Sequence, residues 1–575
     1  MSRFLIFILL LAGISAVQAA MSVSVKLDGL NREQKKNVRA YLTIEQEKKA
    51  DDLTERRIRR YHNRAPREIR EALQPYGYYQ PVIEPSLEQN GDKWVAHYDI
   101  DPGPPVIITA IDLQVEGAGK DDPAIVMVDD LLPVQVGSHF LHADYEKAKK
   151  LFRAAAIENG YREARYLKSE VRVQQAANEA EIVLYLDTGN KAFFGPVRFE
   201  GGTISDERLR RYIPFEAGDV WSTKELLVLQ RGLVDSGYFS SVNIVPQPAQ
   251  AEENRIPIDV ILTPHKRQKY SFGLGFSTNL GVQGSVNWLH RRINHYGHRL
   301  SAETSVSKVR QDVSATYAIP LSKPRSDVLE VSSIFRNEDT VDVKSEVTEL
   351  RVSRNFKRGD WREVLSVGYK HEEDDLADSN GISNLLIPEA TWTLVKADNR
   401  LHSKDGYRLD LETSGSAEAL LSDTTFLQGI VRGKLVRALG KHGRLIMRAD
   451  AGATATSDFE SLPASNRFFT GGDQSVRGYE YKSLSPENED GELIGGKFML
   501  VGSVEYDYNV YEKWYLAAFY DVGNTFNEFP VDAASGAGVG IRWASPVGMV
   551  RVDAASAISE DGQPWRLHIT FGPDF

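Results

Sequence analysis

The sequence contains no cysteine, which excludes a disulfide framework, thiolate chemistry and a cysteine-based zinc site. Beyond the first 20 residues it also has no apolar run near the roughly 20 residues that a transmembrane helix requires. A basic excess is missing too, because the formal net charge is −11 and the pI is near 5.7. We therefore expect no nucleic acid among its main partners, and any membrane span must be a β-barrel.

The N-terminus has the pattern of a signal peptide. Arg3 gives the positive start, residues 4–14 form a short apolar run, and small residues surround Ala19. Such a run is too short to span a bilayer but suits an export signal. A buried N-terminal helix is the alternative. We predict that residues 1–19 are a signal peptide and that the mature protein is exported.

Three similar stretches of about 80–90 residues follow, each the size of a small domain. In each, a strand ends in glycine and a later helix ends at Gly-Tyr. The strand-ending glycines are Gly29, Gly117 and Gly201. We predict three α+β units of order β-α-α-β-β in residues 20–103, 104–189 and 190–266. Their sheet edges could accept a strand from another chain, whereas the alternative role is that of a spacer.

A run of arginines makes the first unit locally basic. Arg56, Arg57, Arg59 and Arg60 lie within five residues. A charge run of this kind is commonly the solvated face of a helix. The alternative hypothesis is a docking patch for an acidic partner or for lipid headgroups.

The pattern of the sequence changes near residue 267, where alternation of apolar and polar residues replaces helical periodicity. Sixteen strand-like runs with turn signals follow, an even number as bacterial barrels require. In the run from Trp514 to Gly523, Asp521 shares a face that cannot cheaply meet lipid, so it must point into the lumen. We predict a 16-stranded antiparallel transmembrane β-barrel over residues 267–575, with a long inward-folding loop at 455–496. A soluble all-β domain is the alternative.

The first and last strands of such a barrel must meet, and the first one is rich in glycine. Glycine weakens a strand, so we expect a lateral seam that opens easily. The residues expected at the seam are Phe272, Gly273, Gly275 and Phe276 on the first strand, and Leu567, Ile569 and Phe571 on the last. Cysteines at Gly273 and Ile569 are one pair that could lock it, subject to the register.

Two motifs carry a resemblance to a known family. Val476-Arg477-Gly478-Tyr479 lies in the long loop, and Phe519-Tyr520-Asp521-Val522-Gly523 lies on the thirteenth strand. With three units before a barrel, the chain resembles the POTRA-barrel, BamA-like superfamily of outer-membrane assembly and translocation proteins. The number of units is most similar to the barrel subunits of translocation and assembly modules.

The resemblance implies a barrel in the outer membrane of a Gram-negative bacterium, with POTRA units in the periplasm. It implies client outer-membrane proteins, autotransporters among them, that enter the membrane at the seam by strand addition. It also implies outer-membrane lipid and a TamB-like inner-membrane-anchored periplasmic protein as partners. The alternative is a two-partner-type transporter that secretes a dedicated substrate through the lumen.

Arg477 needs a counter-charge if the loop folds inward, and Asp521 is the carboxylate that we expect it to meet. The expected lumenal latch comprises Val476, Arg477, Gly478 and Tyr479 with Phe519, Asp521 and Gly523. The alternative is a surface arginine. His290, His295 and His298 cluster without a carboxylate or cysteine at ligand spacing. We expect no catalytic residue, metal or cofactor, and no enzymatic activity.

Overall fold

The computed structural model describes residues 21–575 except 51, 322–325, 341–342, 377–378 and 547. The predicted signal peptide at 1–19 lies outside the described residues. Within the described part, no helix is both long and apolar enough to cross a membrane. The chain divides into two compact parts, and the boundary between them runs through residues 198–258.

Three small units, each with a three-stranded sheet, precede the large sheet. In each sheet the last strand lies in the middle, giving the orders β1-β3-β2, β4-β6-β5 and β7-β9-β8. The first unit comprises β1 (Ser22–Asp28), α1 (Arg32–Tyr41), α2 (Thr43–Gln46), α3 (Glu55–Leu73), η1 (Gln74–Tyr76), β2 (Val82–Asn90) and β3 (Lys93–Asp101). The second comprises β4 (Ile107–Glu116), α4 (Pro123–Val126), η2 (Met127–Leu131), α5 (His142–Glu158), β5 (Arg165–Gln174) and β6 (Glu179–Asp187). The third comprises β7 (Phe193–Glu200), α6 (Asp206–Arg210), α7 (Thr223–Asp235), β8 (Phe239–Pro246), η3 (Pro248–Gln250) and β9 (Arg255–Pro264).

The first unit has one helix more than the order β-α-α-β-β that the sequence predicts. The extra helix is α2, which follows directly after Leu42. Leu42 and Ile44 are both fully buried in the core of this unit. Four residues are too short for any periodic pattern, so burial of these two side chains, rather than a sequence signal, places the helix.

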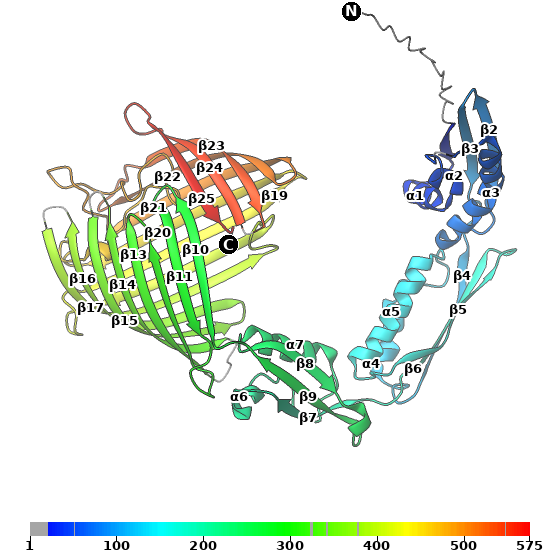
Figure 1. Cartoon of the computed structure of the whole chain (residues 1–575), viewed down its shortest axis with the longest axis horizontal. Coiled ribbons are helices and arrows are strands. Elements are labelled where there is room, and N and C mark those ends of the chain that lie inside the picture. The colour runs from blue at the N-terminus through cyan, green and yellow to red at the C-terminus, as the bar shows by residue number, and fades with distance from the viewer. Residues whose placement is uncertain (1–20, 51, 322–325, 341–342, 377–378, 547) are drawn as a thin grey trace, which may run out of the picture. The chain divides into compact units, whose positions relative to one another are not determined.

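The large sheet contains sixteen antiparallel strands in sequence order, from β10 to β25 (Figure 1). This confirms the predicted barrel and its number of strands. The first eight strands are β10 (Gln268–Ser277), β11 (Gly281–His290), β12 (Arg299–Val306), β13 (Arg310–Pro320), β14 (Asp327–Asp339), β15 (Val343–Arg358), β16 (Trp361–Leu376) and β17 (Ser379–Ala397). The others are β18 (Gly406–Ser416), β19 (Phe426–Leu439), β20 (Gly443–Thr456), β21 (Phe498–Tyr511), β22 (Trp514–Phe526), β23 (Ala534–Ser545), β24 (Gly548–Ala557) and β25 (Trp565–Gly572).

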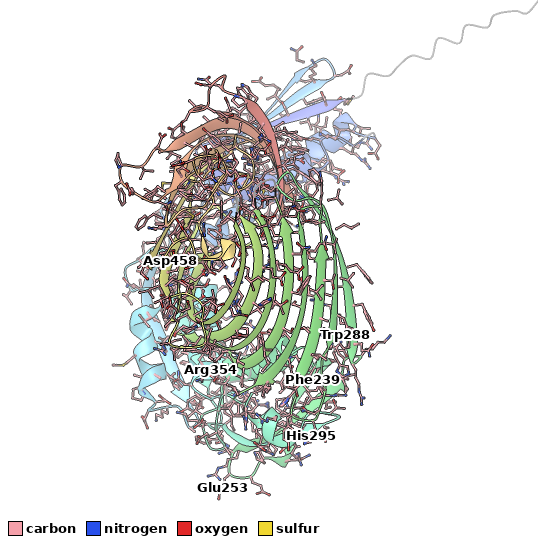
Figure 2. All side chains as sticks on the ribbon, turned by 90° about the vertical axis from the view of Figure 1, so that its left-hand side faces the viewer. Phe239, Glu253, Trp288, His295, Arg354 and Asp458 are labelled. Atoms are coloured by element: carbon pink, nitrogen blue, oxygen red, sulfur yellow. The ribbon has the colours of Figure 1, made fainter. Side chains whose placement is uncertain are left out.

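The wall of the barrel is apolar outside and polar inside. Along β22, Leu516 and Tyr520 are about half exposed, whereas Phe519 and Asp521, at the alternate positions, are buried. Figure 2 shows side chains projecting from both faces of the curved wall. This alternation places every second residue against the membrane and the others in the lumen, as a transmembrane barrel requires. The long loop between β20 and β21 spans residues 457–497.

Candidate functional site

The guanidinium of Arg477, in the long loop, meets Asp521 of β22 inside the barrel. Nε donates to Oδ2 at 2.7 Å and Nη2 donates to Oδ1 at 2.9 Å, so the contact is bidentate. The backbone N–H of Arg477 also donates to Oδ2, at 3.1 Å. Ser503 lies opposite Asp521 in the ladder between β21 and β22, and its hydroxyl donates to Oδ1 at 2.6 Å. Both charged side chains are buried, so the pair fixes the loop against the wall.

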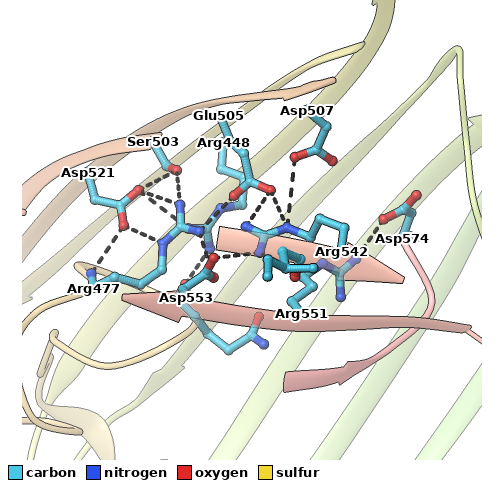
Figure 3. Close-up of polar contacts among 12 residues, drawn as sticks. Arg448, Arg477, Ser503, Glu505, Asp507, Asp521, Arg542, Arg551, Asp553 and Asp574 are labelled. Carbon is cyan, nitrogen blue, oxygen red and sulfur yellow. Dashed lines mark hydrogen bonds and ion pairs between the residues drawn. The ribbon is translucent and has the colours of Figure 1, made fainter. Parts of the chain in front are cut away.

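Asp521 is not the only carboxylate at this guanidinium. Nη1 of Arg477 donates to Glu505 at 2.7 Å and to Asp553 at 3.3 Å. The ring of Phe519 lies under the guanidinium, 3.4 Å from its central carbon (Figure 3 shows the polar contacts). The pair expected from sequence is therefore one side of a larger cluster, and Arg477 bridges three strands, β21, β22 and β24.

A network of alternating charge continues from this cluster along the inner wall (Figure 3). Arg542 of β23 donates to Glu505 at 2.9 Å and also contacts Asp553. Arg444 of β20 pairs with Asp507 at 2.8 Å and with Asp574 at 2.6 Å. Each buried charge in this row has a neighbour of opposite sign, which offsets part of the cost of removing it from water. The sequence reasoning missed all of them except Arg477 and Asp521.

The neighbours of Arg477 in the motif fit closely against the wall. Val476 and Tyr479 are buried in a small apolar cluster with Val501, Ala534 and Ala557. Gly478 has a φ of +102°, and a Cβ there would meet the backbone of β24 at 2.8 Å. Its N–H donates to Nε2 of His568, on the last strand, at 3.0 Å. Only glycine suits both the dihedral angle and the contact.

Two further glycines allow the wall to pack closely here. Gly523, expected in the latch, faces the backbone of β21 at Leu500 and Val501 rather than the guanidinium. Gly536 of β23, which the sequence reasoning missed, lies directly against the carbonyl oxygen of Arg477. A side chain at either position would displace a backbone segment.

A second anchor holds the loop to other strands of the wall. Lys370 and Glu372, both on β16 and both buried, form an ion pair at 2.9 Å. Lys370 donates to the hydroxyl of Ser465 at 2.6 Å, and the N–H of Ser465 donates to Glu372 at 3.0 Å. The carbonyl of Asn466 accepts from Gln428 of β19 at 2.9 Å. The only sequence signal for this anchor is a lysine and a glutamate two residues apart, at positions of a strand that face the lumen.

The first and last strands, β10 and β25, share no ladder among the described residues, although each pairs fully with its other neighbour. Among the described residues, two hydrogen bonds, each 3.3 Å long, directly join the end of the first strand to the last strand. The N–H of Thr278 donates to the carbonyl of Ile569, and the N–H of Ile569 donates to the hydroxyl of Thr278. Ile569 therefore lies opposite Thr278, and the expected pairing with Gly273 is wrong.

The other residues expected at the seam lie on the unpaired edges. Phe272, Leu567 and Phe571 are exposed on the outer face. Gly273 and Gly275 face Ser285 and Gln283 of β11. A cavity of about 270 Å³ lies between the edges, lined by residues of β10, β25 and the long loop that include Gly275, Phe276, Thr570 and Phe571.

The long loop contacts both sides of the seam. Asp473 accepts from the side-chain amide of Asn279, two residues after the end of β10, at 2.6 Å. Glu480 pairs with Arg566 of β25 at 2.8 Å. Residues 473–480, which we call the bridging segment, thus join two edges that have little direct pairing.

The four arginines of the predicted docking patch lie on α3 of the first unit. Arg57 pairs with Asp52, and Arg59 pairs with Glu55 at 2.8 Å. Arg56 and Arg60 form no ion pair with any described residue, and both are exposed. They line an open groove of about 750 Å³ together with Thr54, Glu55, Arg59 and Asn63.

The histidines near the start of the barrel have other contacts. Nδ1 of His298 lies 2.7 Å from the hydroxyl of Tyr317, and the ring of His295 packs on Tyr296. Among the residues that the structure describes, no group of three or more His, Asp or Glu side chains could hold a metal ion.

The fold and the seam define a class of large β-barrel proteins that carry small N-terminal α+β units. Residues 266–575, more than half of the chain, match the Omp85 superfamily domain. The chain therefore belongs to the Omp85 superfamily. Residues 24–102 match the POTRA domain described as TamA domain 1, and residues 192–264 match the POTRA family described as surface antigen variable number repeat.

Two relatives and one solved structure are similar to this chain. The outer membrane protein assembly factor BamA of Nitratidesulfovibrio vulgaris is 22% identical over 503 residues, 83% of this chain and 62% of the relative. The protein of the same name from Neorickettsia risticii is 21% identical over 420 residues, 67% of this chain and 55% of the relative. The chain thus spans less than two thirds of the length of either relative. The crystal structure of BamA from Haemophilus ducreyi lacking POTRA domains 1–3 has a similar fold, with a TM-score of 0.69, 16% identity, and coverage of 81% of this chain and 99% of that one.

Proposed function

We propose that the protein lies in the outer membrane of a Gram-negative bacterium and assists the insertion of client barrel proteins, including autotransporters, at the β10–β25 seam. The observation that carries this proposal is the seam itself, where Thr278 and Ile569 make the direct hydrogen bonds described between the two strand segments. An unpaired strand edge is a template for a strand of another chain. A client strand could add to β10 or β25 by the same backbone hydrogen bonds that build the wall.

The energy for insertion would come from the client. Burial of apolar strand faces in lipid and closure of backbone hydrogen bonds both favour the inserted state. The role that we propose therefore requires no enzymatic step and no cofactor. The seam only has to offer an edge and lower the barrier to entry.

A TamA-type role in a translocation and assembly module is the finer form of the proposal. The match of the first unit to a TamA POTRA domain and the presence of three small units support it. We assign the second unit as a POTRA domain as well, because its sheet has the strand order of the other two. A TamB-like inner-membrane-anchored protein would dock on these units in the periplasm, while the names of the BamA relatives support only the general assembly activity.

Secretion of a dedicated substrate through the lumen, as in two-partner transporters, is the competing function. A substrate in the lumen would have to displace the long loop, which is anchored by Arg477 at one wall and by Lys370 at another. Two buried anchors make that displacement costly, so we favour insertion at the seam.

Reconstitution tests the choice between the two functions. The purified chain in lipid vesicles should accelerate the folding of a urea-unfolded client barrel, measured by its resistance to protease and to SDS. Vesicles without the protein, and vesicles with an unrelated barrel, are the controls. An unchanged folding rate, together with transfer of a secreted passenger into the vesicles, would refute the insertase and favour the transporter.

A further inference from the structure

The start of the barrel carries positive charge without any acidic residue, although the whole chain has a net charge of −11. No aspartate or glutamate occurs between Val260 and Ala302. The lysines and arginines of this stretch are Lys266, Arg267, Lys269, Arg291, Arg292 and Arg299. The stretch covers β10, β11 and the turns at the rim where the barrel begins.

Four of these cations lie in one place, which we call the basic corner and define as Lys266, Arg267, Arg291 and Arg292. Lys269 lies on β10 at a position that alternates with the outward-facing Tyr270 and Phe272, so it is not included. The ladder pairs Gln268 with His290, and the N–H of Arg291 donates to the carbonyl of Arg267 at 2.8 Å. The residues before β10 and after β11 are therefore side by side. Among the described residues, no acidic side chain pairs with any member of the basic corner.

Several cations elsewhere on the same rim have acidic partners. Arg358 pairs with Glu363 at 3.2 Å, and Lys396 pairs with Asp360 at 2.8 Å. These pairs lie at turns that begin or end β15, β16 and β17. The corner beside the seam differs from these turns in having no acidic residue next to its cations in the sequence.

The basic corner also shows the effect of unneutralised charge. Partial burial, followed by repulsion from the guanidinium of Arg267, lowers the pKa of Arg292. Like charges held together in this way favour an anion from outside the chain.

Directly above the corner, the outer face of β10 is apolar and open. Phe272 is 78% exposed and Leu274 is 89% exposed. Figure 2 shows Trp288 of β11 on the outside of the wall, toward the end that carries the turn with His295. Apolar side chains facing outward, an aromatic near the boundary and cations at the rim form the profile of a membrane interface.

We propose that the basic corner binds the phosphate headgroups of anionic phospholipids, whose acyl chains lie along the outer face of β10 and β11. Continuity with the apolar face is what favours a lipid over an acidic polypeptide. Such lipids would occupy the membrane beside the seam, at the strand edge that a client would meet. The proposal rests on the membrane setting of the proposed function, but its test reads lipid binding and not client insertion, so the two can fail separately.

The experiment compares three full-length proteins in vesicles with equal parts of phosphatidylglycerol and phosphatidylcholine. The corner variant is Lys266→Gln, Arg267→Gln and Arg292→Gln, which spares Arg291 because its side chain donates to the carbonyl of Gly237 at 3.2 Å. The matched control neutralises paired cations of the same rim, Arg358→Gln, Lys396→Gln and Arg437→Gln. After mild detergent extraction, mass spectrometry counts the two lipids retained by each protein, and resistance to SDS without heating shows that each barrel is folded.

The wild type and the control should retain phosphatidylglycerol in excess over phosphatidylcholine. In the folded corner variant the ratio of the two lipids should fall about tenfold, because each cation near an anionic surface strengthens binding several-fold. The excess should also fall as salt screens the charges. No excess in the wild type, or the same loss in the control, would overturn the proposal. Complete displacement of the lipid by an acidic peptide, such as polyglutamate, would also overturn the proposal, since the corner would then recognise polypeptide. If the corner variant does not fold, the salt dependence of the wild-type excess decides.

Discussion

Arg477 is held by geometry that a lysine could not reproduce. Its planar guanidinium makes two parallel bonds to Asp521, reaches Glu505 with a third nitrogen and stacks on Phe519. A lysine offers one point charge and would leave at least one buried carboxylate without a donor. The motif therefore needs arginine for its shape as well as for its charge.

The two partners of the latch should not be equivalent. Arg477→Ala leaves three buried carboxylates near one another, whereas Asp521→Ala leaves the arginine with Glu505 and Asp553. We expect Arg477→Ala to cost roughly 3–5 kcal/mol of barrel stability and Asp521→Ala less. The midpoint of unfolding in a heated-gel assay measures both, and the double mutant should cost less than the sum. Additive effects would contradict a direct pair.

Gly536 offers a second test of the contact between loop and wall. A methyl group there would meet the carbonyl oxygen of Arg477, so Gly536→Ala should cost about 1–3 kcal/mol by overpacking. Gly429→Ala on β19 is the matched control, because no heavy atom lies within 4 Å of a Cβ at that position. Equal midpoints for the two variants would show that the loop does not press on β23.

The residues of the site were only partly visible in the sequence. Arg477 and Asp521 stand in recognisable motifs. Glu505 and Asp553 do not, because they lie 28 and 76 residues from Arg477 and meet it only through the register of the closed wall. Arg542 and Asp574 were missed for the same reason. A charged residue on an alternating strand shows that it faces inward but not which charge lies opposite.

At the scale of elements, the barrel strands were predictable because their signal is local. Alternation with a period of two, broken by turn residues, located all sixteen strands. The seam register was not predictable, because Thr278 and Ile569 are 291 residues apart and no turn links them. The short helix α2 was missed because its position depends on burial and not on periodicity.

The bridging segment should hold the two edges of the seam together. Asn279→Ala removes its hydrogen bonds to Asp473, so the segment keeps its contacts with β21, β22, β24 and β25 but loses those to the end of β10. We expect the backbone amides of β10 to exchange hydrogen for deuterium several-fold faster in this variant, because local opening becomes easier. Asn287→Ala on β11 is the control. Unchanged exchange in β10 would mean that the segment does not restrain the seam.

At the scale of the whole molecule, the small units and the barrel have different tasks in the proposed function. The units would bind the inner-membrane-anchored partner, and the barrel would receive the client. On the first unit, Arg56 and Arg60 are the arginines of the docking patch that lack an ion pair within the described residues.

This division predicts which charges matter for docking. Arg56→Glu with Arg60→Glu should abolish most co-purification of a TamB-like partner from membranes in mild detergent. Arg64→Glu with Arg67→Glu is the control on the same helix, because these arginines already pair with Glu68 and Glu71. Full recovery of the partner with the first variant would leave α3 as an ordinary solvated helix face.

The central claim, that clients enter at the seam, is tested most directly by locking it with a disulfide. Cysteines at Thr278 and Ile569 follow the observed register, and the chain has no other cysteine to interfere. Cysteines at Ser285 and Ser305, which pair within the wall between β11 and β12, are the control. Oxidation of the seam pair should abolish client folding in reconstituted vesicles, reduction should restore it, and the control pair should have no effect. Client folding at the full rate with the seam completely crosslinked would contradict the account.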